Sequence, residues 1–248
     1  YGVFAMLGLI AGTSLRKSDI FSSLVERPTD TPHGKVLLFT TPAGAPTPML
    51  FCQRHDRDGQ FVPPHNVNYH GNLRALRDAG ATRIVAIYSV GGLSLQHGPG
   101  TLVIPDDYFH PWSPATYSER GPDCKFIAPQ LDAAMREKLI AIAAACPAVT
   151  KLVPRGVYVQ TPGPRFETRA EVRYLRQLGD IIGMTGANEA TLAQELDVPF
   201  GMVCMVDNHA NGITAAPLSI ESFHAAVEAN RLTMEALVRD IIAAFATA

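Results

Sequence analysis

Short apolar runs alternate with amphipathic stretches along most of the chain. Each apolar run is rich in β-branched or aromatic side chains and ends at glycine, proline or polar residues, which indicates a buried strand. The strands predicted in this way are residues 3–10, 35–40, 49–53, 83–89, 101–104, 156–160, 181–184 and 201–206.

The stretches between these runs carry apolar side chains at helical spacing. They predict helices over residues 67–79, 130–145, 169–178, 187–196 and 220–246. Because strands and helices alternate, we expect an α/β fold in which a mixed central β-sheet is flanked by helices on both faces.

Three segments interrupt the pattern. Residues 27–34 and 40–48 are rich in proline and threonine and resemble hairpin turns at a sheet edge, since the prolines of the second segment are too closely spaced for a helix. Residues 105–129 mix proline, tyrosine, serine and tryptophan, so we expect a loop there that is mobile or lies at an interface.

The composition fits one domain over residues 1–248. Hydrophobic residues make up 47% of the chain and charged residues 18%, which is enough apolar material for a sizeable core. The net charge is −2, with Lys and Arg dispersed along the chain, so we expect no nucleic-acid partner. A locally basic site for a small molecule remains compatible with this charge.

The cysteines and the first residues bear on location. Cys52, Cys124, Cys146 and Cys204 show neither a CxxC motif nor a Cys/His metal spacing, so we expect them to be buried and reduced and the protein to be cytoplasmic. Residues 1–10 are apolar but too short to span a bilayer and lack a basic leader, which predicts a first strand and no membrane partner.

Polar clusters stand where several predicted strands end. Thr13 follows the first strand, and Arg54 and His55 follow residues 49–53; a hydroxyl group and a guanidinium fork both suit phosphate. The alternatives are a tight turn without a ligand and an ordinary surface arginine. Ser89 leads into a Val-Gly-Gly turn, where backbone N–H groups can face an anion.

Two later motifs suit a nucleoside. In GPRFET, Phe166 can stack on a heterocycle while Glu167 accepts its N–H protons; the alternatives are a core phenylalanine and a helix N-terminal charge. In GMTG, Met184 can pack against a sugar and Thr185 can reach phosphate. The following Glu189 either accepts from ribose hydroxyls or caps the helix.

Asn208 closes the last cluster. Its amide offers a donor and an acceptor together, which suits purine N7 and an adjacent carbonyl, although Asp207-Asn208 after a strand is also a common turn. Because strands of an α/β sheet present their carboxyl ends at one edge, the clusters jointly predict a crevice for a nucleoside and phosphate.

Several of these segments also carry a family resemblance. They are the Arg54-His55 pair, a VNYxxNLxAL-like helix at residues 67–76, the turn at residues 90–92, GPRFET and GMTGxxE. From its first strand to its last helix, the chain resembles the trimeric purine nucleoside phosphorylase and methylthioadenosine phosphorylase family.

The resemblance implies phosphorolysis of an N-glycosidic bond by a homotrimer, with inorganic phosphate as co-substrate and no metal or organic cofactor. It assigns a role to each matching residue, with Glu167 and Asn208 as the catalytic pair. The implied contacts are Thr13, Arg54, His55, Ser89 and Thr185 for phosphate, Tyr69 and Met184 for ribose, Val90 and Gly91 for substrate in general, and Phe166, Glu167 and Asn208 for the purine.

Within the family, Glu167 and Asn208 match members that use 6-oxopurines, although the neighbouring Asp207 keeps the register open. Ile220 stands where users of a 5′-hydroxyl place a histidine, and an apolar contact favours a methylthio group. The combination resembles the 5′-methylthioinosine phosphorylase branch, unless a shifted register brings His224 to this place.

The chain also departs from the family pattern at Ser14, Asp56, Tyr88 and Asn188, which bears on phosphate affinity. Phe126 is a candidate for the aromatic residue that a neighbouring subunit lends to the pocket. Three alternatives follow: an inosine or guanosine phosphorylase without methylthio preference, a hydrolase in which water replaces phosphate, and a catalytically weak nucleoside-binding protein.

Overall fold

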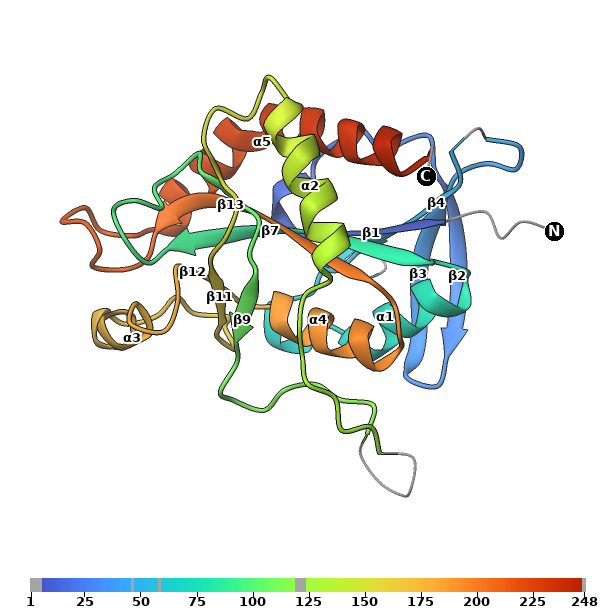
Figure 1. Cartoon of the computed structure of the whole chain (residues 1–248), viewed down its shortest axis with the longest axis horizontal. Helices are drawn as coiled ribbons and strands as arrows, with labels where there is room; N and C mark the ends of the chain where they lie inside the picture. Colours follow the sequence, from blue (N-terminus) through green and yellow to red (C-terminus); the bar gives the residue numbers. More distant parts are fainter. Residues whose placement is uncertain (1–5, 46, 58, 119–123, 247–248) are drawn as a thin grey trace.

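The computed structural model describes residues 6–45, 47–57, 59–118 and 124–246. In this part of the chain, eleven strands form one mixed sheet, and helices cover both of its faces (Figure 1). The fold class expected from the sequence is thereby confirmed.

Four parallel strands form the centre of the sheet. β13 pairs with β7, β7 with β1, and β1 with β4, all in parallel. These strands are nearly continuous apolar runs, as expected for parallel strands that are buried on both faces. Their bounds are β1 Leu7–Ala11, β4 Met49–Gln53, β7 Arg83–Gly92 and β13 Phe200–His209.

Helices pack on the two faces of these strands in pairs. α1 (Tyr69–Asp78) and α4 (Gly186–Glu195) share one core with Ile84 and Ala86 of β7. Val85 of the same strand lies in a second core, on the opposite face. Alternate residues of one strand thus serve two cores, because successive side chains point to opposite faces.

The second core is closed by α2 (Ala133–Ala145) and α5 (Ile220–Ala246), which cross the upper face of the sheet in Figure 1. The side chain of Asp132 caps α2 by accepting from the backbone N–H of Met135 at 2.8 Å. The five predicted helices are all present, with ends shifted by a few residues.

One edge of the sheet differs from the sequence prediction. Residues 27–34 were expected to form a turn, but most of them lie in β2 (Val25–Thr31), which pairs antiparallel with β3 (Gly34–Thr40). β3 in turn pairs antiparallel with β4. Pro28 is tolerated because β2 is an edge strand, where a missing N–H leaves no ladder bond broken.

The other side of the sheet is built from short strands. β12 (Ile181–Gly183) pairs antiparallel with the end of β7 and parallel with β11 (Val157–Gln160), which also pairs with β9 (Asp107–Phe109). β8 (Leu102–Val103) joins β13 to β10 (Leu152–Val153). β9 and β10 were not predicted, and β9 falls in the expected loop 105–129, part of which lies outside the described residues.

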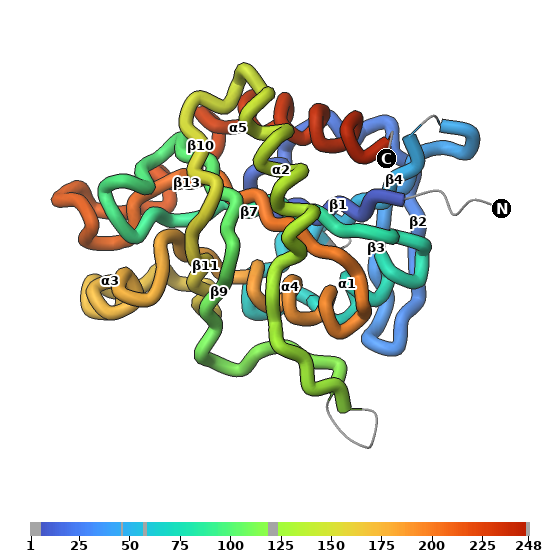
Figure 2. The backbone as a smooth tube through the Cα atoms, in the orientation of Figure 1, coloured from blue at the N-terminus to red at the C-terminus, as the bar shows by residue number. Residues whose placement is uncertain are grey.

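Two short connections shape the region around the strand ends. The 3-10 helix η1 (Thr13–Leu15) follows β1, and η2 (Pro64–Asn66) precedes α1. Between β4 and η2 lies a small hairpin of β5 (Asp56–Arg57) and β6 (Gln60–Phe61). α3 (Arg169–Leu175) stands apart from the two helix layers, as the tube of Figure 2 shows.

The cysteines match most of the expectation. Cys52, Cys146 and Cys204 are buried, Cys124 is partly exposed, and all four are free thiols. Within the described segments, no helix is both long and apolar enough to cross a membrane.

Candidate active site

A pocket opens at the carboxyl ends of β1, β4, β7 and β13, where an α/β sheet commonly binds its ligand. Most of the residues singled out in the sequence come together here. The predicted residues that line the pocket are Thr13, Arg54, His55, Ser89, Val90, Gly91, Phe166, Glu167, Met184, Thr185 and Asn208.

The pocket also contains side chains that the sequence analysis assigned no role in binding. They are Pro64, Tyr88, Ile182, Ala210 and Phe223. Of the predicted residues, Tyr69, Asp207 and Ile220 do not line it.

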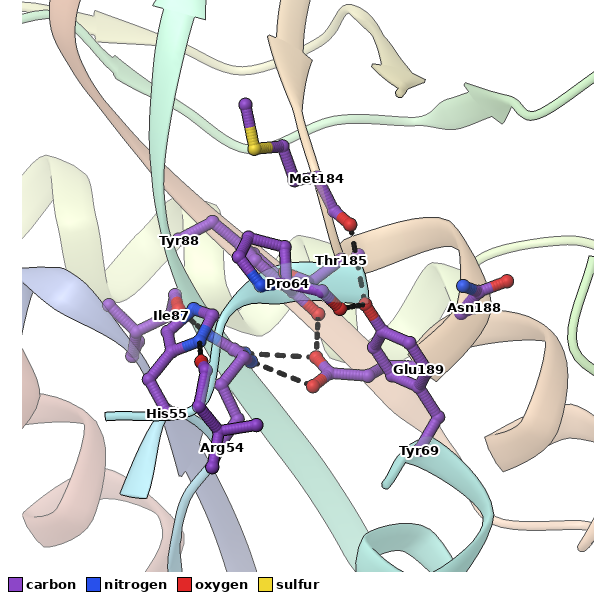
Figure 3. Close-up of polar contacts among 12 residues, drawn as sticks. Arg54, His55, Pro64, Tyr69, Ile87, Tyr88, Met184, Thr185, Asn188 and Glu189 are labelled. Carbon is purple, nitrogen blue, oxygen red and sulfur yellow. Dashed lines mark hydrogen bonds and ion pairs between the residues drawn. The ribbon is translucent and has the colours of Figure 1, made fainter. Parts of the chain in front are cut away.

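Arg54 is buried and held by several contacts. It is 3% exposed and forms a bidentate ion pair with Glu189, with Nε to Oε1 at 2.7 Å and Nη2 to Oε2 at 2.9 Å (Figure 3). Nη1 donates to the carbonyl oxygen of Ile87 at 2.9 Å. Burial opposes the charge, but Glu189 outweighs burial and raises the pKa of Arg54.

Glu189 therefore takes neither of the roles considered from the sequence. Its side chain is fully buried, lies outside the pocket lining, and accepts from Arg54 and from the Tyr88 hydroxyl, the latter at 2.5 Å. The Arg54 Cζ atom also lies 4.5 Å from the centroid of the Tyr88 ring. Tyr88, a departure from the family pattern, thus contacts Arg54 through its ring and the Glu189 partner of Arg54 through its hydroxyl group.

Gly12 is required beside this arginine. A Cβ atom at this position would lie 2.6 Å from Arg54 Nη1 and 3.1 Å from the His55 ring. Any side chain larger than hydrogen would displace the guanidinium, so the glycine allows Arg54 to reach the pocket.

His55 is neutral at pH 7. Burial, and then the charge of Arg54, lower its pKa to about 4. Its Nδ1 lies 2.8 Å from the carbonyl oxygen of Val62, which can only accept a hydrogen bond. Nδ1 therefore carries the ring proton, and Nε2 presents a lone pair.

Glu167, Phe166 and Asn208, which were expected to contact a purine, line the same pocket. Glu167 is buried, and burial raises its pKa, while Thr161 donates a hydrogen bond to its Oε1 at 2.6 Å. Asn208 Nδ2 donates to the carbonyl oxygen of His209 at 2.8 Å, so its amide orientation is fixed. The second carboxylate oxygen of Glu167 has no hydrogen bond from a described side chain in this geometry.

A β-bulge decides between Asp207 and Asn208. Val206 pairs with Val90 and Asn208 pairs with Gly91, which leaves Asp207 as the extra residue. Asn208 consequently enters the pocket. Asp207 is buried beneath it, accepting hydrogen bonds from Ser89 Oγ and from Asn230 Nδ2, the latter at 2.7 Å.

Tyr69 supports the pocket from behind. Its hydroxyl donates to the carbonyl oxygens of Pro64, at 2.9 Å, and Met184, at 3.3 Å (Figure 3). It therefore positions two residues that line the pocket, whereas the sequence assigned it a direct ribose contact.

At the start of α5, Phe223 takes the place expected for Ile220. Ile220 is 49% exposed, whereas Phe223 lines the pocket with its ring centroid 5.9 Å from that of Phe166, edge to face. His224 packs on Phe223 outside the pocket lining. The available signal was an aromatic residue one helical turn after Ile220, on the same helix face.

Among the described residues, no group of three or more His, Cys, Asp or Glu side chains is arranged to hold a metal ion.

The stability of the protein should depend on pH through Asp207. Burial raises its pKa from 3.8 to about 6, so the fold favours the protonated carboxyl and loses stability as pH rises through this interval. This rise in pKa corresponds to a loss of about 3 kcal/mol in the free energy of unfolding once Asp207 is fully ionised. We expect Asp207→Asn, which keeps a donor and an acceptor, to gain stability over the wild type between pH 4 and 6 and to keep the gain above. Urea unfolding at several pH values in this range measures the free energy of unfolding of both proteins. If this free energy changes with pH in the same way in both, the prediction is contradicted.

Tyr88→Phe should destabilise the protein by about 1–2 kcal/mol, because Glu189 then loses a buried hydrogen bond. Tyr108→Phe is the matched control: it removes a hydroxyl that bonds Thr191 at 2.9 Å, away from Arg54. In urea unfolding both variants should lose stability. Only Tyr88→Phe should also weaken sulfate binding, and equal sulfate affinities in the two variants would contradict the role of Tyr88.

Comparison with known proteins supports the family resemblance seen in the sequence. The model of the phosphorylase superfamily matches residues 6–243. The probable S-methyl-5′-thioinosine phosphorylase of Methanopyrus kandleri is 36% identical over 92% of this chain and 85% of the relative. The 6-oxopurine nucleoside phosphorylase of Pyrococcus furiosus is 36% identical over 88% of this chain and 84% of the relative.

Solved structures share the fold. A mutant adenosine/methylthioadenosine phosphorylase from Schistosoma mansoni, in complex with methylthioadenosine, superposes with a TM-score of 0.82 at 23% identity, covering 96% of this chain and 91% of that one. Sequence and fold agree over nearly the whole chain: the protein belongs to the phosphorylase superfamily.

Proposed function

We propose that this protein is a purine nucleoside phosphorylase that cleaves 6-oxopurine nucleosides, with 5′-methylthioinosine preferred over inosine. The observation that carries the proposal is that one pocket is lined both by Glu167 and Asn208 and by the hydroxyl-bearing residues Thr13, Ser89 and Thr185. Relatives that match most of the chain are named for both of these activities.

Glu167 and Asn208 account for the base. With Oε1 occupied by Thr161, Oε2 of an ionised Glu167 is left to accept N1–H of a 6-oxopurine. A 6-aminopurine presents a lone pair at N1 and would leave that carboxylate unpaired, which is costly in a buried site. The second N–H of the Asn208 amide is left to donate to N7 or O6.

The anion end suits monohydrogen phosphate. Thr13 and Thr185 offer hydroxyl donors, and Arg54 keeps N–H groups that Glu189 and Ile87 do not use. His55 Nε2 can accept a hydrogen bond from a phosphate O–H group. Phosphate in this form is both donor and acceptor, and so are the groups around it.

The proposed reaction is phosphorolysis. A phosphate oxygen bonds to C1′ while the bond from C1′ to N9 breaks, and the electron pair of that bond goes to the purine. The phosphate dianion stabilises the cationic sugar of the transition state. Asn208 donates to the purine as negative charge develops on it, so it binds the transition state more tightly than the substrate. Glu167 holds the base in place by accepting N1–H.

Phe223 carries the preference at the 5′ position. Its ring faces the pocket from α5, beside Phe166, and offers no hydrogen-bond partner to a 5′-hydroxyl. An apolar methylthio group gains contact area there, worth about 10-fold or more in discrimination.

We also propose a cytoplasmic homotrimer. Phe126 is 96% exposed, which supports its proposed role in the pocket of a neighbouring subunit, and the free thiols suit a reducing compartment. Light scattering should give the mass of three chains. A monomer that is active at all concentrations would contradict the trimer.

The first test is purine release from five nucleosides, with and without phosphate. We expect strict phosphate dependence and the order 5′-methylthioinosine, then inosine and guanosine, then 5′-methylthioadenosine and adenosine. Release without phosphate would favour a hydrolase, and binding without release would favour a nucleoside-binding protein. A preference for inosine would contradict only the 5′ argument.

Two variants separate base recognition from 5′ recognition, each serving as the control of the other. Asn208→Asp should lower kcat/KM for inosine about 100-fold, because the donor to the purine is lost. The ratio of methylthioinosine to inosine should stay unchanged. Phe223→Ala should lower that ratio about 10-fold and leave the ratio of inosine to adenosine unchanged. If either variant changes both the ratio of methylthioinosine to inosine and the ratio of inosine to adenosine, the assignment of Asn208 to the base and Phe223 to the 5′ group is contradicted.

A further inference from the structure

Asp207 occupies an unusual position beside the anion end of the pocket. It is the extra residue of the β-bulge, is 2% exposed, and belongs to the strand that carries Asn208. Its Oδ2 is hydrogen-bonded to Ser89 Oγ of β7, and its Oδ1 accepts from Asn230 Nδ2 of α5 at 2.7 Å. Ser89 itself lines the pocket.

A serine hydroxyl has only one proton, and this proton has two possible destinations. If Asp207 is ionised, its Oδ2 can only accept, so Ser89 must donate to it. Ser89 then presents lone pairs to the pocket, and these repel an anion. If Asp207 holds a proton on Oδ2, the carboxyl donates to Ser89 Oγ, and the Ser89 hydroxyl is free to donate to the anion.

We propose that Asp207 is a positioning residue that, in its protonated form, turns the Ser89 hydroxyl toward the bound phosphate. Anion binding then takes up one proton at Asp207. The inference rests on the proposed function, since it assumes that the pocket binds phosphate between Ser89 and the neighbouring strand ends.

The surroundings of Asp207 make it easier to protonate than a carboxyl in water. Burial raises its pKa to about 6, while the hydrogen bonds from Ser89 and Asn230 act in the opposite direction. A bound anion nearby adds a like charge, which raises the pKa further. The anion affinity should therefore fall as the pH rises above about 6.

Other titratable groups around Asp207 are distinguishable from it. His209 lies two residues along the same strand, Arg231 and Glu235 on α5 pair with each other, and His55 across the pocket has its pKa lowered to about 4. None of these described side chains hydrogen-bonds to Asp207. All of them remain in place in an Asp207 variant.

Sulfate is the suitable probe, because it stays a dianion throughout the range in which phosphate itself titrates. Asp207→Asn is the matched variant, since its Nδ2 donates to Ser89 and its Oδ1 accepts from Asn230 at every pH. Sulfate dissociation constants would be measured by calorimetry for both proteins at pH 6, 7 and 8. Buffers of different ionisation enthalpy report the number of protons taken up.

For the wild type we expect affinity to fall by up to about tenfold per pH unit, with proton uptake on binding at pH 7. For Asp207→Asn we expect an affinity constant within about twofold from pH 6 to 8, no proton uptake, and tighter binding than the wild type at pH 8. Ser89→Ala should reduce the pH dependence, because the hydroxyl that Asp207 turns is gone and only the direct repulsion between the Asp207 charge and the anion remains. A purely structural role for Asp207 would leave the pH slope intact in the variant.

Other outcomes separate this inference from the proposed function. A wild type that cleaves nucleosides with phosphate but binds sulfate equally at pH 6 and 8, or not at all at pH 6, would overturn the role of Asp207 alone. An Asp207→Asn variant that retains the wild-type slope would do the same. A protein that neither cleaves nucleosides with phosphate nor binds the anion at any pH would overturn both.

Discussion

The buried ion pair of Arg54 and Glu189 is the constraint around which the site is arranged. Two charges taken out of water are tolerated only when each is paired and its remaining hydrogen-bonding groups are satisfied. Here the pair joins the end of β4 to α4, and the bond from Arg54 to the Ile87 carbonyl joins both to β7. Tyr88 completes the shell of Glu189, and Gly12 leaves the space for the guanidinium. Three elements distant in sequence are thereby fixed at one edge of the sheet.

The same pair changes the electrostatics of anion binding. Because Glu189 pairs with the Arg54 charge and His55 is neutral, the proposed phosphate would be held in this pocket by hydrogen bonds more than by free positive charge. In such a site the position of each proton decides whether a group attracts or repels an oxyanion. A carboxyl next to Ser89 fits this setting, provided that it keeps its proton when the anion is bound.

The sequence predicted the central strands, the five helices and most of the pocket lining, because long apolar runs and strand-end clusters are local signals. It did not predict the short strands β9 and β10, whose pairing depends on neighbours far along the chain. The bulge at Asp207 was also hidden, since a bulge is defined by the register with β7 and not by the residues of β13 alone. Ile220 was expected at the pocket, with His224 as the alternative, and Phe223 was not considered. The face that a helix turns to a pocket depends on how the helix packs.

α5 connects the two ends of the pocket. Phe223 and Asn230 are seven residues apart, which is about two helical turns, so both lie on the same face of the helix. Most side chains in the first turns of α5 are exposed. Phe223 and Asn230 belong to the narrow stripe through which these turns contact the rest of the protein. A 5′ substituent that packs on Phe223 would therefore contact the same helix that places Asn230 against Asp207. In the proposed reaction the 5′ group and the phosphate lie at different ends of the substrate, yet one rigid helix bears on both. A poorly packed 5′ group should for this reason affect phosphate affinity as well as nucleoside affinity, since the Asn230 bond helps to fix the carboxyl beside Ser89.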